Sequence, residues 1–154
     1  MNQGAKGVEL GTSLGYLLKQ AHSVLHSAMD AALRPLGLTV SQYACLEILA
    51  QRPGLSGSEL ARAAFVSRQS MNVLLQTLER DGLVSRQEHP QGGRTLPVEL
   101  TAAGRAKLQV ASSAAQSVEE AMSSGLDGAE QAQLRRQLAA CVSALEARGR
   151  TDAQ

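Results

Sequence analysis

The sequence lacks a long hydrophobic run. No stretch of its 154 residues approaches the roughly 18 to 20 consecutive apolar residues of a membrane-spanning helix. The first residues, MNQGAKGVELGTSLG, also lack the apolar centre of a secretory signal peptide. We therefore expect a cytoplasmic protein. A hydrophobic content of 44% argues against disorder, and the length predicts one domain over 1–154.

Cysteine is also scarce. Cys45 and Cys141 are too few for a disulfide framework and lack the spacing of zinc ligands. Cys45 lies between two apolar residues, so we expect it to fill the core. His22 and His26 are four residues apart and could offer two metal ligands, but no third ligand lies nearby in sequence. We expect neither a bound metal nor another cofactor.

Motifs that carry catalysis are missing. The chain has three histidines, no nucleophile with a recognisable flanking motif, and no glycine-rich phosphate loop after a predicted strand. These absences predict that the protein is not an enzyme. A net charge of +1 does not itself indicate a nucleic-acid binder.

Arginine is concentrated in one part of the chain. Between residues 52 and 94 there are six arginines, four acidic residues and no lysine. The planar guanidinium can donate two parallel hydrogen bonds to a phosphate or a guanine, which lysine cannot do. Arginine-rich usage can also reflect the base composition of the genome, so the distribution alone does not identify a partner.

Residues typical of helix starts recur along the chain. Capping boxes, in which a side chain at the N-cap and one three residues later bond each other's backbone N–H groups, are predicted for Thr39 with Gln42, Ser56 with Glu59, and Asp127 with Glu130. Ser67 and Thr101 are simpler N-cap candidates. An earlier helix begins near Leu14 and ends before Pro35. The later helices are expected over 40–51, 57–64, 68–81, 102–124 and 128–148.

The central segment has the order of a winged helix. Two short helices, 57–64 and 68–81, are joined by the brief connector AFVS, which is typical of a helix-turn-helix. LVSRQ and TLPVEL then form strand-like runs around Gly92 and Gly93, which predicts a hairpin. The fold class is mainly α with a small β-wing. We expect the winged helix-turn-helix to span 38–101, inside a helical dimerisation platform made of 8–36 and 102–148.

Three segments together resemble the MarR family of transcriptional regulators. They are LGLTVSQYACLEIL, LSGSELARAAFVSRQSMNVLLQTLERDGLVSR and LTAAGRA, and the resemblance extends from about residue 13 to 148. It implies a homodimer that binds double-stranded DNA at an inverted repeat and responds to a small aromatic or phenolic effector. The apolar faces of the end helices also favour a second copy. Those faces contain Leu14, Leu18, Leu25, Leu108, Val118, Met122, Leu134 and Leu138.

The residues expected to meet DNA follow from helical spacing. Met71, Leu74, Leu75 and Leu78 recur on one face of the second short helix and belong in the core. The opposite face is left for DNA, and it contains Ser67, Arg68, Gln69, Ser70, Asn72, Val73 and Gln76.

The wing carries one further DNA candidate. In the family the arginine at the wing tip enters the minor groove, and Arg94 occupies that position. The chain departs from the family pattern two residues earlier, where Gly92 replaces the usual aspartate. This departure puts the orientation of Arg94 in doubt.

His22, His26 and Tyr43 are the candidates for effector binding, because the family binds small aromatic acids between its dimerisation helices and its winged helix. Two alternatives stay open from the sequence. One is a winged helix used for protein contacts, although the polar face of 68–81 argues against it. The other is a thiol- or metal-responsive regulator using Cys45 or the two histidines.

Overall fold

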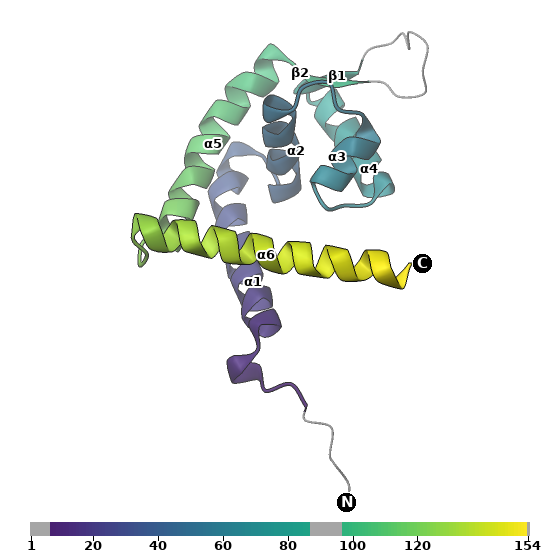
Figure 1. Ribbon diagram of the computed structural model, residues 1–154. Helices are drawn as coiled ribbons and strands as arrows, with labels where there is room; N and C mark the ends of the chain where they lie inside the picture. The colour runs from purple at the N-terminus through teal and green to yellow at the C-terminus, as the bar shows by residue number, and fades with distance from the viewer. Residues whose placement is uncertain (1–6, 87–96, 154) are drawn as a thin grey trace, which may run out of the picture. The chain divides into compact units, whose positions relative to one another are not determined.

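The protein is mainly helical, and its computed structural model describes residues 7–86 and 97–153. Within these residues two strands pair with each other (Figure 1). The helices are α1 (Leu14–Leu33), α2 (Val40–Gln51), α3 (Gly57–Ala63), α4 (Arg68–Arg80), α5 (Ala102–Met122) and α6 (Gly128–Asp152). Short 3-10 turns are η1 (Leu10–Thr12) and η2 (Arg34–Leu36), and the strands are β1 (Val84–Arg86) and β2 (Val98–Leu100).

Two of the three predicted capping boxes are confirmed. Oγ1 of Thr39 accepts from the N–H of Gln42 at 3.1 Å, and Gln42 Oε1 accepts from the N–H of Thr39 at 2.9 Å. Asp127 and Glu130 make the same reciprocal pair. Each box satisfies two N–H groups that the helix itself leaves without acceptors.

The third box was predicted incorrectly in its second half. The Ser56 hydroxyl accepts from the N–H of Glu59 at 3.2 Å, as expected for an N-cap. The Glu59 carboxylate, however, accepts from the Ser56 hydroxyl at 2.9 Å instead of from the backbone. The Ser56 hydroxyl therefore both accepts from the backbone N–H of Glu59 and donates to the carboxylate of the same residue.

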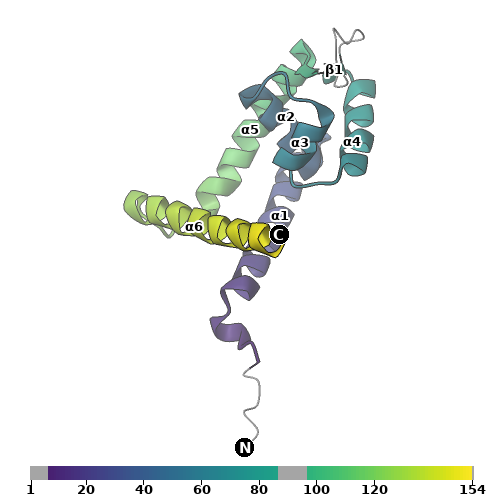
Figure 2. The same ribbon diagram turned by 45° about the vertical axis from the view of Figure 1, so that its right-hand side comes forward.

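Backbone contacts join the wing to the helix-turn-helix. Helices α3 and α4 lie side by side, with β1 following α4 (Figure 2). The strands are antiparallel, with Ser85 opposite Glu99. The N–H of Val98 also donates to the carbonyl of Leu55 at 3.0 Å, which ties the wing to the start of α3. Pro97 precedes β2, so it removes no hydrogen bond from the paired strands.

Gly104 fixes how closely α5 approaches the wing. A Cβ at this position would lie 2.0 Å from the carbonyl oxygen of Leu83. The Thr101 hydroxyl donates to the carbonyl of Gly82 at 2.6 Å and accepts from the N–H of Gly104 at 3.0 Å. Thr101 is therefore the N-cap of α5, as predicted, and also links that helix to the end of α4.

The core lies inside the winged helix and its junctions with α1 and α5. Its fully buried side chains are Leu33, Cys45, Leu46, Leu60, Met71, Leu75, Leu78 and Val98. Leu108 is only 7% exposed, so the expectation that it needs a partner chain was wrong. Its side chain packs into the same core as Ala111 and Ala115.

The chain divides into two compact units, Met1–Val118 and Glu119–Gln154, and the boundary falls within α5. In the second unit α6 has an exposed stripe of Leu134, Leu138, Val142 and Leu145. Among the described residues, no helix is long and apolar enough to cross a membrane.

Candidate nucleic-acid interface and ligand cavity

Helix α4 has one buried face and one exposed face. Met71, Leu75 and Leu78 are each 0% exposed. Their spacing of three and four residues keeps them on one side of the helix. All seven residues predicted to meet DNA lie on the exposed side: Ser67, Arg68, Gln69, Ser70, Asn72, Val73 and Gln76.

The N-terminus of α4 is held by serine hydroxyls. Ser67 Oγ accepts from the N–H of Ser70 at 3.1 Å and donates to Ser70 Oγ at 3.0 Å. This cap fixes the direction of the first turn, which carries Arg68 and Gln69. A polar, capped and exposed helix face of this kind can dock in a major groove.

The wing has a described base and an undescribed tip. Arg94, the predicted minor-groove residue, and Gly92 lie outside the described residues. At the base, Nε of Arg86 lies 3.4 Å from Oε1 of Glu79, which pairs β1 with α4.

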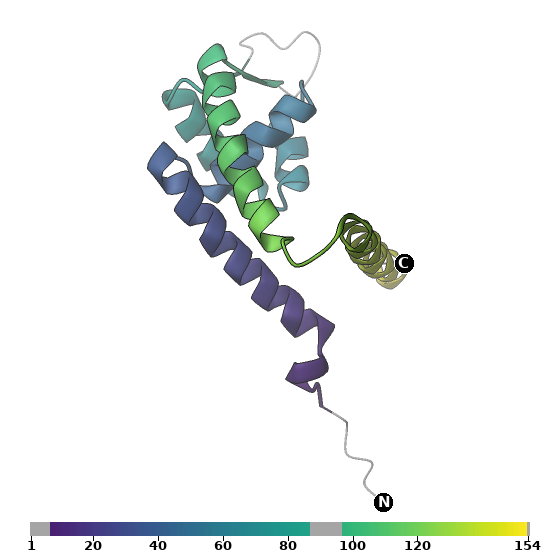
Figure 3. The same ribbon diagram turned by 90° about the vertical axis from the view of Figure 1, so that its left-hand side faces the viewer.

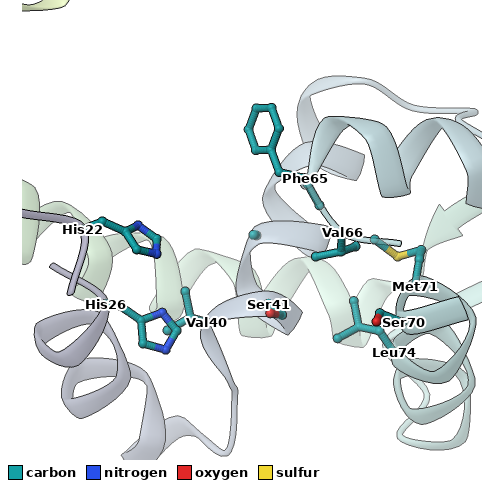
Figure 4. A pocket seen from close by; sticks show the side chains of 11 residues that line it. His22, His26, Val40, Ser41, Phe65, Val66, Ser70, Met71 and Leu74 are labelled. Carbon is teal, nitrogen blue, oxygen red and sulfur yellow. The ribbon is translucent and has the colours of Figure 1, made fainter. Parts of the chain in front are cut away.

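A cavity of about 430 Å³ lies between α1, α2 and the helix-turn-helix (Figure 4). Helix α1 contributes His22 and His26, whose ring centroids are 6.2 Å apart. The other elements contribute Val40, Ser41, Ala44, Ala64, Phe65, Val66, Ser70, Met71 and Leu74. Two imidazoles and two hydroxyls thus accompany an apolar lining, a combination suited to a small amphipathic ligand.

A second hollow of about 190 Å³ shares both histidines with the first and adds Tyr43. Leu25 and Met29 of α1 line it together with Val40 and Ala44. The structure therefore brings His22, His26 and Tyr43 together, although the sequence places Tyr43 on a different helix. Their part in ligand binding stays a prediction.

Tyr43 also belongs to a hydrogen-bond network around Glu47. The Ser112 hydroxyl donates to Glu47 Oε2 at 2.6 Å, and the Gln51 side chain donates to Oε1 at 2.9 Å. Burial raises the pKa of Glu47, but hydrogen bonds from Ser112, Gln51 and Tyr43 outweigh it and lower the pKa overall. The carboxylate therefore stays ionised and links α2 to α5.

Cys45 is fully buried, which confirms its predicted place in the core. Burial raises the pKa of its thiol to about 11, so the reactive thiolate is suppressed. No group of three or more His, Cys, Asp or Glu side chains in the described part of the chain could hold a metal ion. The buried, protonated thiol disfavours a regulator that responds through Cys45.

Phe65 is a cavity residue that the sequence analysis missed. It lies in the turn between α3 and α4, where its backbone has a positive φ of 58°. Its side chain is 94% exposed. The signal in the sequence was a bulky aromatic residue inside a connector of only four residues, AFVS.

The chain is similar to known proteins in sequence and in structure. A model of the MarR family matches residues 36–95. The HTH-type transcriptional repressor Rv2887 of Mycobacterium tuberculosis is 42% identical over 125 residues, covering 81% of this chain and 90% of the relative.

Two crystal structures of that M. tuberculosis protein are also similar. Its complex with DNA is 39% identical, with a TM-score of 0.71, and the match covers 84% of this chain and 98% of that one. Its complex with salicylic acid is 41% identical, with a TM-score of 0.69, over 84% of this chain and 96% of that one.

Proposed function

Because the chain belongs to the MarR family, we propose that it is a ligand-responsive transcriptional regulator that binds specific DNA sequences as a homodimer. Its 154 residues then form a single MarR-type domain that works in the cytoplasm, where chromosomal DNA lies. The observation that carries the proposal is α4, with an apolar face packed into the core and an exposed face that is mostly polar. The relative solved with DNA supports the same use of this fold.

Each DNA-facing residue has a chemical preference. Arg68 can donate two hydrogen bonds to guanine, and Gln69 or Asn72 can pair with adenine. Val73 can contact a thymine methyl group. Ser67, Ser70 and Gln76 then hold phosphates, which position the helix without reading sequence. Arg94 reaches the minor groove from the wing.

The first half of α1 supports the proposed homodimer. Leu14 and Leu17 are 71% and 60% exposed, although both are large apolar residues. Packing this face against a second copy would remove it from water and place two recognition helices on one duplex. The operator is then an inverted repeat whose half-sites lie about 10 to 10.5 base pairs apart.

Binding to the DNA upstream of its own gene, measured at several salt concentrations, tests this function. A dimer that neutralises 6 to 10 phosphates gives a log–log salt slope of about −5 to −9. Arg68→Ala should weaken specific binding by about 1 to 3 kcal/mol, the usual value of a bidentate base contact. Arg148→Ala is the matched control, because Arg148 is 80% exposed on α6, outside the winged helix. A salt-independent interaction would refute DNA binding of this kind.

The cavity supports control by a small aromatic or phenolic acid. His22 and His26 line it, and Tyr43 joins both histidines in the adjoining hollow of about 190 Å³. The similar M. tuberculosis protein has been solved with salicylic acid. Such a ligand lowers DNA affinity only if it binds the DNA-free conformation better, and a coupling of about 1 to 3 kcal/mol is ordinary.

The test is release of labelled DNA by sodium salicylate, with repression read from a reporter gene. Repression is the expected direction, since the relative is named a repressor. His26→Ala should reduce the response to salicylate more than it reduces DNA affinity without salicylate. A response that is equal in both proteins would exclude His26 from the effector site.

A further inference from the structure

Phe65 has a backbone conformation that its side chain does not favour. Among the described residues it is the only non-glycine residue with positive φ, at 58°. The turn is fixed by its neighbours, because the N–H of Val66 donates to the carbonyl of Ala61 at 3.0 Å. A Cβ crowds the backbone in this region, so glycine or asparagine is the usual choice for such a turn.

Burial in the core also does not stabilise the Phe65 ring. Its side chain is 94% exposed, the highest value among the exposed large hydrophobic residues of the described chain. Two unfavourable features therefore coincide in one residue. Glycine would satisfy the turn, and any polar residue would suit the exposure, so the fold alone gives no reason for phenylalanine here.

The position of Phe65 supplies a reason. The residue belongs to the lining of the 430 Å³ cavity, together with His22 and His26 from α1. In Figure 4 the Phe65 ring projects upward from the turn between α3 and α4, while Val66, Met71 and Leu74 lie lower in the view. An aromatic ring at the edge of a cavity with imidazoles on its other side can contact a flat ligand that polar groups already hold.

We propose that Phe65 is a specificity-determining residue of this cavity, whose ring packs against the aromatic ring of the effector and selects aromatic over saturated carboxylic acids. This inference rests on the proposed effector control. Ligand binding would cover the exposed ring, and aromatic pairs in offset or edge-to-face geometry gain more than their buried area alone provides. His22, His26, Ser41 and Ser70 are the groups available for the carboxylate of the acid.

The experiment compares benzoate with cyclohexanecarboxylate, which share a carboxylate and a six-membered ring. Binding to the full-length chain is measured by calorimetry, together with release of bound DNA. The wild-type protein should prefer benzoate by about 3- to 10-fold, the range expected for one aromatic pair. Phe65→Leu keeps an apolar side chain and the unfavourable φ but lacks the ring, so its preference should fall below about twofold.

Two further variants separate the ring from the backbone. Phe65→Tyr keeps an aromatic ring and should retain the preference for benzoate. Phe65→Gly should weaken binding of both acids, yet its melting temperature should stay the same or rise, since glycine adopts positive φ without crowding. Val110→Ala is the matched control, because Val110 is another exposed hydrophobic residue, 56% exposed on α5, and does not line the cavity.

A preference for benzoate that persists in Phe65→Leu would overturn the role of Phe65 and leave effector control intact. Weaker dimerisation in Phe65→Leu, with unchanged discrimination between the acids, would assign the ring to a partner subunit and also overturn it. If neither acid bound the wild-type protein or released its DNA, control by aromatic acids would itself fail, and the inference with it.

Discussion

Helix α4 and the first half of α1 both carry large apolar side chains at helical spacing, but only α4 packs a face of them into the core. Met71, Leu75 and Leu78 of α4 are each 0% exposed, whereas Leu14, Leu17 and Leu18 of α1 are 71%, 60% and 46% exposed. The first half of α1 extends away from α2, α3 and α4 (Figure 3). The sequence pattern is similar in the two helices, so the difference arises from what surrounds them.

The two halves of α1 repeat this contrast within one helix. Near its end, Met29 is 9% exposed and Leu33 is fully buried, because they reach the core of the winged helix. Full burial of one such side chain contributes about 1.5 to 3 kcal/mol. The winged helix thus stabilises itself, while the first half of α1 would gain comparable stability only in the proposed homodimer. Unfolding should then depend on protein concentration mainly through α1.

The largest expected effect comes from making the same substitution in both regions. Leu75→Ala should lower the free energy of unfolding by about 2 to 5 kcal/mol, because it leaves a cavity in a fully buried site. Leu17→Ala should cost much less at a low protein concentration, where a dimer has dissociated. Urea unfolding at two protein concentrations measures both. Equal losses at low concentration would show that the two faces are buried alike.

The next effect compares Gly104 of α5, which lies against the wing, with Gly15 in the first half of α1. Gly104→Ala places a Cβ 2.0 Å from the Leu83 carbonyl oxygen, so α5 must move away from the wing. We expect a loss of about 1 to 3 kcal/mol or more, the usual cost of overpacking. Gly15→Ala in α1 is the control, since its Cβ would meet only Ser13 Oγ at 3.8 Å. Thermal unfolding should show a lower melting temperature for the first variant alone.

Most elements of the fold could be predicted from local patterns. The start of α2 was predicted correctly from Thr39 and Gln42, because capping depends on residues close in sequence. The hairpin was predicted from glycines and alternating residues, and its described strands confirm it. Helical periodicity also identified the buried face of α4.

Other features depend on contacts between distant residues. Leu108 reads like any apolar residue of a long helix, and only its position beside the core shows that it is buried. The bond between Ser112 and Glu47 joins residues 65 positions apart, so no local pattern indicates it. The 190 Å³ hollow also depends on how α1 packs beside α2. This packing places Tyr43 beside the two histidines.

The third prediction tests the exposed face of α1 directly. Leu18→Glu should weaken dimerisation at least tenfold, because a carboxylate would have to lose its water in an apolar interface. Sedimentation equilibrium at several concentrations measures the change. Val73→Glu is the matched control, since Val73 is 60% exposed on α4 and should affect DNA binding but not dimerisation. An unchanged dimer in Leu18→Glu would remove α1 from the interface.

The smallest expected effect lies between α5 and α2, where Ser112 donates to Glu47 at 2.6 Å. Ser112→Ala should lower the free energy of unfolding by about 1 kcal/mol near pH 7, since a partly exposed bond to a charged acceptor is lost.

The dependence of this loss on pH follows from the lowered pKa of Glu47. A carboxylate with a lowered pKa adds stability above its unfolded pKa of about 4.3, and the contribution disappears as the pH falls through the folded value. The difference between wild type and Ser112→Ala should therefore be full above about pH 5 and shrink at lower pH.

Ser113→Ala is the control for this experiment, because it makes the same change of helix propensity at the next, exposed position. Denaturant unfolding between pH 3 and 7 should show a pH-dependent loss for Ser112→Ala and none for Ser113→Ala. A loss that stayed constant over this range could not come from a hydrogen bond to an ionised carboxylate. In that case α2 and α5 would be held together by packing of Leu46 and Leu108 with their core neighbours, and not by Glu47.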